Sequence, residues 1–264
     1  MSEADTPTAV RNAVSQAMSR VKREYYGKGP ARTRTYIFDT VVFSILDDVL
    51  TPVEQALKER GRGELVRHVR LTFQDIMTRA FTEQVEQATG ARVIAYHSQL
   101  VYDPDMAIEI FVLDRPVTPG AVAAPVALAR PGAVGDADDL PSGPRDRPVV
   151  ASRRQDGQVR AAIADAMVRL TREHWGKGPV RAKAYLEDQF VFAVLEDPLT
   201  TVERTLIDGG EQALVRRLRQ EFQEVANPAF AAEVEKATGR RVLTGHAQVV
   251  FDPDIVFEVF VLED

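Results

Sequence analysis

The chain repeats itself once at a constant spacing, and this duplication constrains the fold more than any other feature of the sequence. Val10–Asp114 aligns with Val159–Glu263 without a gap, and about 50 of the roughly 105 aligned pairs are identical. A unit of roughly 100 residues is large enough to fold alone, whereas the repeats of a solenoid run to roughly 20–50 residues. The sequence therefore predicts two tandem domains, at residues 1–114 and 158–264.

The segment between the two copies, residues 115–157, has a different composition. It is rich in proline, glycine and alanine and follows neither a helical nor a strand period. Such a composition is typical of a semi-extended, solvated tether. The alternative, that this segment packs as an ordered arm, stays open at the level of sequence.

Composition excludes several classes of protein. The chain has no cysteine, which excludes disulfides and thiolate metal sites. Its net charge is −6, and neither copy carries the clustered basic residues that sequence-independent nucleic-acid binding needs. No apolar run reaches the ~18 residues of a membrane span, and the N-terminus lacks a secretory pattern. We therefore expect a cytoplasmic protein that binds no nucleic acid and does not itself span a membrane.

The hydrophobic periodicity of each copy predicts the order α-β-β-α-α-β-β. In the first copy we expect a helix over residues 10–25, a hairpin over 33–46, a short helix from residue 51, a long helix over 63–88 and a second hairpin over 92–113. Thr51 and Glu54 have the spacing of a capping box, which Thr200 and Glu203 repeat. The predicted fold class is α+β, with one antiparallel four-stranded sheet per domain and helices on one face.

Two details of the long helix are further expectations. Its apolar stripe is expected at Leu65, Val69, Phe73 and Ile76. A break is expected near residues 78–79, because the second copy has asparagine followed by proline at the equivalent positions 227–228.

Taken in order, these motifs resemble the MpsC-like family, named for a Na+-translocating membrane-potential-generating system. The resemblance is carried by Gly27–Pro30 after the first helix, the Leu-Thr-x-x-Glu run at Leu50–Glu54 and the Thr-Gly-x-x-Val run at Thr89–Val93. It covers both copies and leaves out the linker. It implies an accessory role beside a membrane ion-transport system, at the cytoplasmic side of the inner membrane, and it supplies no catalytic residues.

A polar group on the last hairpin of each copy is the first candidate site. Pairing Tyr102 with Met106 places its members on the sheet face that carries no helices. They are His97, Gln99, Glu109 and Phe111 in the first copy and His246, Gln248, Glu258 and Phe260 in the second. The mixed composition favours an interface between two sheets, while a ligand or proton site built on the histidine and a solvated face remain alternatives.

An arginine pair on each long helix is the second candidate. Arg67 and Arg70, repeated as Arg216 and Arg219, are three residues apart and share a helix face. Two adjacent guanidiniums can bind a carboxylate, a phosphate or bicarbonate. They can equally form ion pairs with acidic residues of the same domain, which is the interpretation we favour.

These observations favour a non-enzymatic accessory or interaction protein. Its expected partners are a second copy of the domain, within the chain as a pseudo-dimer or between chains as a homo-oligomer, and by resemblance a membrane transporter. The alternative is a small-anion-binding protein or enzyme that uses the arginine pair with His97 and Glu109 as an acid/base pair. No cofactor or metal is predicted, because the four histidines have no metal-ligand spacing.

Overall fold

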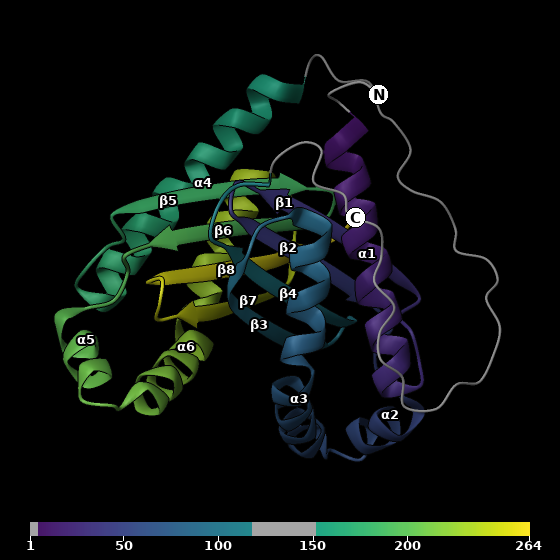
Figure 1. The fold of residues 1–264 in the computed structure, drawn as a ribbon. Helices are drawn as coiled ribbons and strands as arrows, with labels where there is room; N and C mark the ends of the chain where they lie inside the picture. The colour runs from purple at the N-terminus through teal and green to yellow at the C-terminus, as the bar shows by residue number, and fades with distance from the viewer. Residues whose placement is uncertain (1–4, 118–151) are drawn as a thin grey trace. The chain divides into compact units, whose positions relative to one another are not determined.

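The computed structural model describes residues 5–117 and 152–264, which form two units of the same architecture (Figure 1). The elements of the first unit are α1 (Asp5–Tyr26), β1 (Arg32–Phe38), β2 (Val41–Asp47), α2 (Pro52–Glu59), α3 (Gly63–Thr89), β3 (Val93–Tyr102) and β4 (Asp105–Leu113). Those of the second are α4 (Ser152–Trp175), β5 (Arg181–Glu187), β6 (Phe190–Glu196), α5 (Thr201–Asp208), α6 (Gln212–Thr238), β7 (Val242–Val250) and β8 (Ile255–Leu262). The predicted α+β fold class and order of elements are confirmed.

Each unit contains one four-stranded antiparallel sheet. The strand order is β1-β2-β4-β3 in the first unit and β5-β6-β8-β7 in the second. Two hairpins therefore lie side by side, and the strands that pair them, β2 with β4 and β6 with β8, occupy the middle of each sheet. The segment between the units was expected to span residues 115–157; α4 begins at Ser152, and residues 118–151 lie outside the described residues.

Helices pack on one face of each sheet because one side of every element is apolar. In the first unit α1 contributes Val14 and Met18 to the core and α3 contributes Phe81, and these pack with Val42 and Phe111 of the sheet. All five side chains are buried. Burial of large apolar side chains of this kind contributes about 1.5–3 kcal/mol each, so this layer is the main source of each unit's stability.

The short helices α2 and α5 begin at the predicted capping boxes. The Thr51 hydroxyl accepts a hydrogen bond from the Glu54 backbone N–H, and the Glu54 carboxylate accepts one from the Thr51 backbone N–H. Thr200 and Glu203 form the same pair of bonds. Each box satisfies two N–H groups that the first turn of a helix leaves unpaired, and it fixes the position of a buried glutamate.

The predicted apolar stripe of α3 is wrong in part. Leu65, Val69 and Ile76 are 41 %, 48 % and 63 % exposed. The helix is rotated so that a different row, including Val66, Arg70, Met77 and Phe81, faces the core. Because Arg70 lies in the middle of that row, the row cannot be recognised in the sequence as an apolar stripe.

The predicted break in the long helix is also wrong. α6 continues through Pro228, and α3 continues through the equivalent position. Proline removes one N–H and leaves the carbonyl four residues earlier without its helical partner. Pro228 and Glu224 are both exposed, so that carbonyl can bond to water and the helix tolerates the proline.

The register of the last hairpin differs by one residue from the prediction. Tyr102 pairs with Asp105 rather than with Met106, so Ser98, and not Gln99, lies opposite Glu109. A shift of one residue moves a side chain to the other face of a sheet. Glu109 and Phe111 therefore face the helices, while His97 and Gln99 remain on the helix-free face. The same register separates Glu258 and Phe260 from His246 and Gln248.

Candidate functional site

The second arginine of each predicted anion-binding pair forms a buried ion pair. The Arg70 Nε and Nη2 atoms donate to the two carboxylate oxygens of Glu54 at 2.5 and 2.6 Å, and Nη2 also donates to the Val49 carbonyl at 2.8 Å. Its guanidinium lies 4.3 Å from the centre of the Tyr26 ring. Although burial opposes it, the hydrogen bonds from Arg70 and Thr51 hold the pKa of Glu54 below its usual value. Arg70 thus already has a carboxylate partner from its own unit.

Arg219 repeats this arrangement in the second unit. It donates to Glu203 at 2.6 and 2.8 Å and to the Pro198 carbonyl at 3.2 Å, and it stacks 4.1 Å from the Trp175 ring centre. Side-by-side bonds of this kind are strong and direction-specific. The bonds to Glu203 join α5 to α6, and the stacking on Trp175 joins α6 to the C-terminal end of α4.

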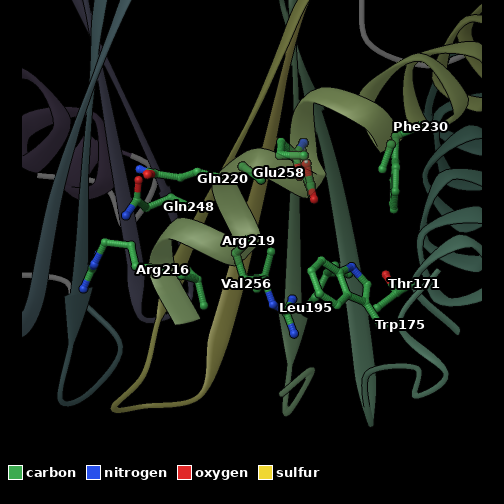
Figure 2. Close-up of a pocket in the computed structure, with 14 residues that line it drawn as sticks. Thr171, Trp175, Leu195, Arg216, Arg219, Gln220, Phe230, Gln248, Val256 and Glu258 are labelled. Carbon is green, nitrogen blue, oxygen red and sulfur yellow. Dashed lines mark hydrogen bonds between the residues drawn. The ribbon is translucent and has the colours of Figure 1, made fainter. Parts of the chain in front are cut away.

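The first arginine of each pair lies apart from this ion pair. Arg67 is about half exposed and lies 3.7 Å from Glu64. Arg216 lies over the Phe251 ring at 5.1 Å, and burial lowers its pKa. Its side chain points away from Glu258 (Figure 2). The first unit therefore does not bring its two arginines together as a clamp for one anion, whereas Arg216 and Arg219 of the second unit line the same cavity.

The predicted acid/base pair is likewise not assembled. His97 and Glu109 lie on opposite faces of the first sheet, and His246 and Glu258 lie on opposite faces of the second. His246 Nε2 lies 3.0 Å from the Thr244 hydroxyl, on the same strand. The two glutamates instead occupy the interior of the helix-packed layer, where their surroundings differ between the units.

In the first unit the buried carboxylate has a lysine partner. Lys22 of α1 places Nζ 2.8 Å from Glu109 Oε1, and the two side chains are 5 % and 0 % exposed. The Tyr96 hydroxyl donates to Glu109 Oε2 at 2.8 Å. The ammonium also lies 5.1 and 5.2 Å from the ring centres of Tyr26 and Phe81. The charge of Glu109 is thus neutralised by a lysine that two aromatic rings enclose.

In the second unit both partners are replaced. Thr171 stands where the first unit has Lys22, and Gly245 stands where it has Tyr96. Glu258 accepts a hydrogen bond from Gln223 Nε2 at 3.1 Å, and the nearby Arg219 forms its ion pair with Glu203. Burial raises the pKa of Glu258 to about 8, against the opposing effects of the Gln223 hydrogen bond and the Arg219 charge. This carboxyl group is therefore mostly protonated at pH 7.

A cavity of about 30 Å³ lies beside Glu258. This volume is enough for one or two water-sized groups. Trp175, Arg219 and Glu258 line it together with Thr171, Gln223 and Phe230 (Figure 2). All six come from α4, α6 and β8, so the cavity belongs to the second unit alone. It combines a buried carboxyl group with two guanidinium groups, amide groups and aromatic rings.

Sequence reasoning missed the residues that distinguish the two sites. Lys22 and Tyr96 were not among the candidate residues, and neither were Thr171 and Gly245. A signal was present, because aligning the two copies shows these substitutions directly. What it could not show is that both changes surround the same glutamate.

No group of three or more histidine, aspartate or glutamate side chains within 5–117 and 152–264 could hold a metal ion. In the same residues no helix is both long enough and apolar enough to cross a membrane.

Comparison with known proteins places this architecture in a family. The family model described as Na+-translocating membrane potential-generating system (MpsC) matches residues 6–115 and again residues 155–264. The chain belongs to the MpsC family. It contains two tandem MpsC copies, as the resemblance indicated.

One curated relative is the uncharacterized protein YrhF of Bacillus subtilis (strain 168). It is 27 % identical over 100 residues, which cover 37 % of this chain and 82 % of the relative. The match therefore spans about the length of one MpsC copy. No solved structure matches the chain.

Proposed function

We propose that the chain is a non-enzymatic accessory protein of a Na+-translocating membrane-potential-generating system, and that it acts through protein contacts at the cytoplasmic side of the membrane. The observation that carries this proposal is the MpsC family match over both units. The use of Arg70 and Arg219 in buried ion pairs supports it, because the residues proposed for anion binding already have partners.

This role is testable in the native cell. A tagged chain would be cross-linked, recovered and examined by mass spectrometry, and the Na+-dependent membrane potential would be measured with and without the gene. The proposal predicts recovery of an integral membrane component of a Na+-transport system and a reduced potential in the deletion strain. Recovery of the chain alone, together with an unchanged potential, would overturn it.

We propose further that the two units pair through their helix-free sheet faces. The middle strands carry mainly apolar side chains on this face: Phe43, Ile45, Ile108 and Ile110 in the first unit, and Phe192, Val194, Phe257 and Val259 in the second. Exposing so many large apolar side chains to water is unfavourable, and such a face is typical of an interaction surface. The sister unit supplies a matching face on the same chain, where the linker gives it a high effective concentration.

Small-angle scattering of the full chain tests this pairing. Phe43→Asp combined with Phe192→Asp is expected to increase the maximum dimension, because two buried carboxylates would face each other across the pair. Val53→Asp with Val202→Asp is the matched control, since both valines are 70 % exposed on the short helices. Circular dichroism of each variant would show whether both units remain folded. An unchanged scattering profile in a folded Phe43→Asp/Phe192→Asp variant would show that the faces do not pair.

A further inference from the structure

The long helix α3 carries an apolar row that the packing of its own unit leaves exposed. Leu65, Val69 and Ile76 are 41 %, 48 % and 63 % exposed. Their spacings of four and seven residues place the three side chains on one face of the helix, roughly 100° around the axis from the row that faces the core. We call this row the exposed stripe of α3.

The second unit repeats the exposed stripe at the equivalent positions of α6. These positions hold Leu214, Leu218 and Val225, which are 51 %, 45 % and 74 % exposed. Leu71 of α3 is also exposed, at 52 %, but it lies off the stripe, and its equivalent in α6 is Gln220. Both copies thus keep an apolar row on the surface of the long helix, while an exposed leucine beside it is not kept. A surface row of this kind is typical of an interaction site.

The charged side chains that border the two stripes differ in sign. They are Arg62, Arg79 and Glu83 on α3, and Glu211, Arg217 and Glu221 on α6. The border of the α3 stripe is therefore net positive and that of the α6 stripe net negative. Charges of opposite sign favour contact between the two stripes, and like charges disfavour contact of either stripe with its own kind.

We propose that the exposed stripe of α3 packs antiparallel against the exposed stripe of α6 in a second copy of the chain. A twofold dimer forms this contact twice, since each chain supplies one helix of each kind. When the middles of the stripes are matched, Leu65 lies beside Val225 and Ile76 lies beside Leu214. The apolar side chains of both helices are then removed from water.

The same antiparallel register brings Arg79 beside Glu211. The Arg79 side chain is 89 % exposed, and its Nε bond to Glu83 leaves the other guanidinium N–H groups available for a second carboxylate. Glu211 is exposed at the start of α6. This pair fixes the direction in which the two helices pack.

The choice of a second copy as the partner rests in part on the proposed pairing of the sheet faces. Two units that meet through their helix-free faces carry α3 and α6 on opposite outer sides, so the two stripes of one chain cannot reach each other. An anionic lipid surface would attract the border of the α3 stripe but repel that of the α6 stripe. A second copy satisfies both stripes at once.

Sedimentation velocity of the full chain over a range of concentrations up to about 100 µM tests this dimer. Two helix contacts bury an area at the low end for specific interfaces, so we expect a dissociation constant in the micromolar range. Ile76→Glu is expected to raise this constant at least about tenfold, because it places a carboxylate among apolar side chains. Leu71→Glu is the matched control, since it makes the same change of charge off the stripe at a similar exposure, and it should leave the constant unchanged.

A charge exchange tests the direction of packing. Arg79→Glu and Glu211→Arg should each raise the dissociation constant about threefold or more, and the double variant should restore it. Circular dichroism would show that each variant is folded. A chain that stays monomeric at about 100 µM, or equal effects of Ile76→Glu and Leu71→Glu, would overturn the proposal.

The result is independent of the test of sheet pairing. A monomeric chain whose scattering profile still changes in Phe43→Asp/Phe192→Asp would overturn the helix contact and leave the sheet pairing in place. A monomer that expands on Ile76→Glu would show that the stripe is covered within one chain, which would also overturn the proposal.

Discussion

At the centre of the first unit the buried Glu109 pairs with a lysine. The equivalent Glu258 of the second unit instead accepts a hydrogen bond from an amide and lines a cavity. Around this point the units agree closely: both have a bidentate arginine–glutamate pair and a capping box. Stability and fold therefore depend on features that the units share. Although the units differ at about half of their aligned positions, the changes from Lys22 to Thr171 and from Tyr96 to Gly245 fall around the same buried carboxyl group. The two units can therefore serve as controls for each other at this point.

The largest predicted effect concerns what the units share. Arg70→Ala and Arg219→Ala should each destabilise their own unit by about 3–5 kcal/mol, because each leaves a buried carboxylate without its partner. Urea unfolding followed by circular dichroism measures both units, and Trp175 fluorescence follows the second. Arg67→Ala, at a half-exposed position, should change stability by no more than about 0.5 kcal/mol. A large effect in only one unit would contradict the shared scaffold.

A second prediction concerns the difference between the units. Lys22→Met should lower the stability of the first unit by about 1–3 kcal/mol, since it removes the charged partner of Glu109 while retaining an apolar stem of similar size. Thr171→Val is the matched change in the second unit, where threonine stands at the position of Lys22, and it should alter stability by less than about 1 kcal/mol. Urea unfolding at pH 7 measures both changes in stability. Equal losses for Lys22→Met and Thr171→Val would show that the lysine is no special partner of the buried glutamate.

The pH dependence of the second unit sharpens the same comparison. The pKa of Glu258 in the folded chain is about 8, above the value of about 4.3 for an unfolded glutamate. Between these values the folded state holds a proton that the unfolded state has lost, so stability falls as pH rises. The expected slope is at most about 1.4 kcal/mol per pH unit. Trp175-detected unfolding from pH 5 to 8 should show it, and Glu258→Gln should reduce it.

The smallest predicted effect concerns the capping boxes, which the two units share. Thr51→Ala and Thr200→Ala should each cost about 1 kcal/mol, because each removes the side-chain acceptor at the start of a short helix. Thr51→Ser and Thr200→Ser keep the hydroxyl and serve as controls. A cost confined to one unit in urea unfolding would show that the two caps differ in spite of their equal geometry.

Local features of the fold were predictable from the sequence because they depend on neighbouring residues. The capping box at Thr51 and the order of helices and strands belong to this class. The register of the last hairpin was not, since Asp103-Pro104-Asp105 fits a turn of two residues as well as one of three, and a single-residue shift reverses the face of Glu109. The rotation of α3 was hidden because Arg70 occupies the core-facing row.

The candidate site was predictable only in part. The sequence marks Glu109 and Glu258 as unusual polar residues of the last hairpin, but the register that it suggests places them on the wrong face of the sheet. Lys22 lies on the first helix, far from Glu109 in the chain, and no local pattern links them. Only tertiary packing brings a lysine from α1 against a glutamate from β4. A column-by-column comparison of the two copies would have drawn attention to the change at residue 171.

The buried carboxyl group of Glu258 in the second unit is expected to hold its proton at pH 7, because burial raises its pKa to about 8. Carbon-13 NMR of the glutamate carboxyl groups, with Glu258→Gln used for assignment, measures this directly in the full chain. We expect Glu258 to titrate with a midpoint near 8 and Thr171→Lys to move this midpoint well below 7, because an adjacent ammonium favours the ionised form. Titration of Glu258 at the ordinary pKa of a glutamate, with no response to Thr171→Lys, would contradict this expectation.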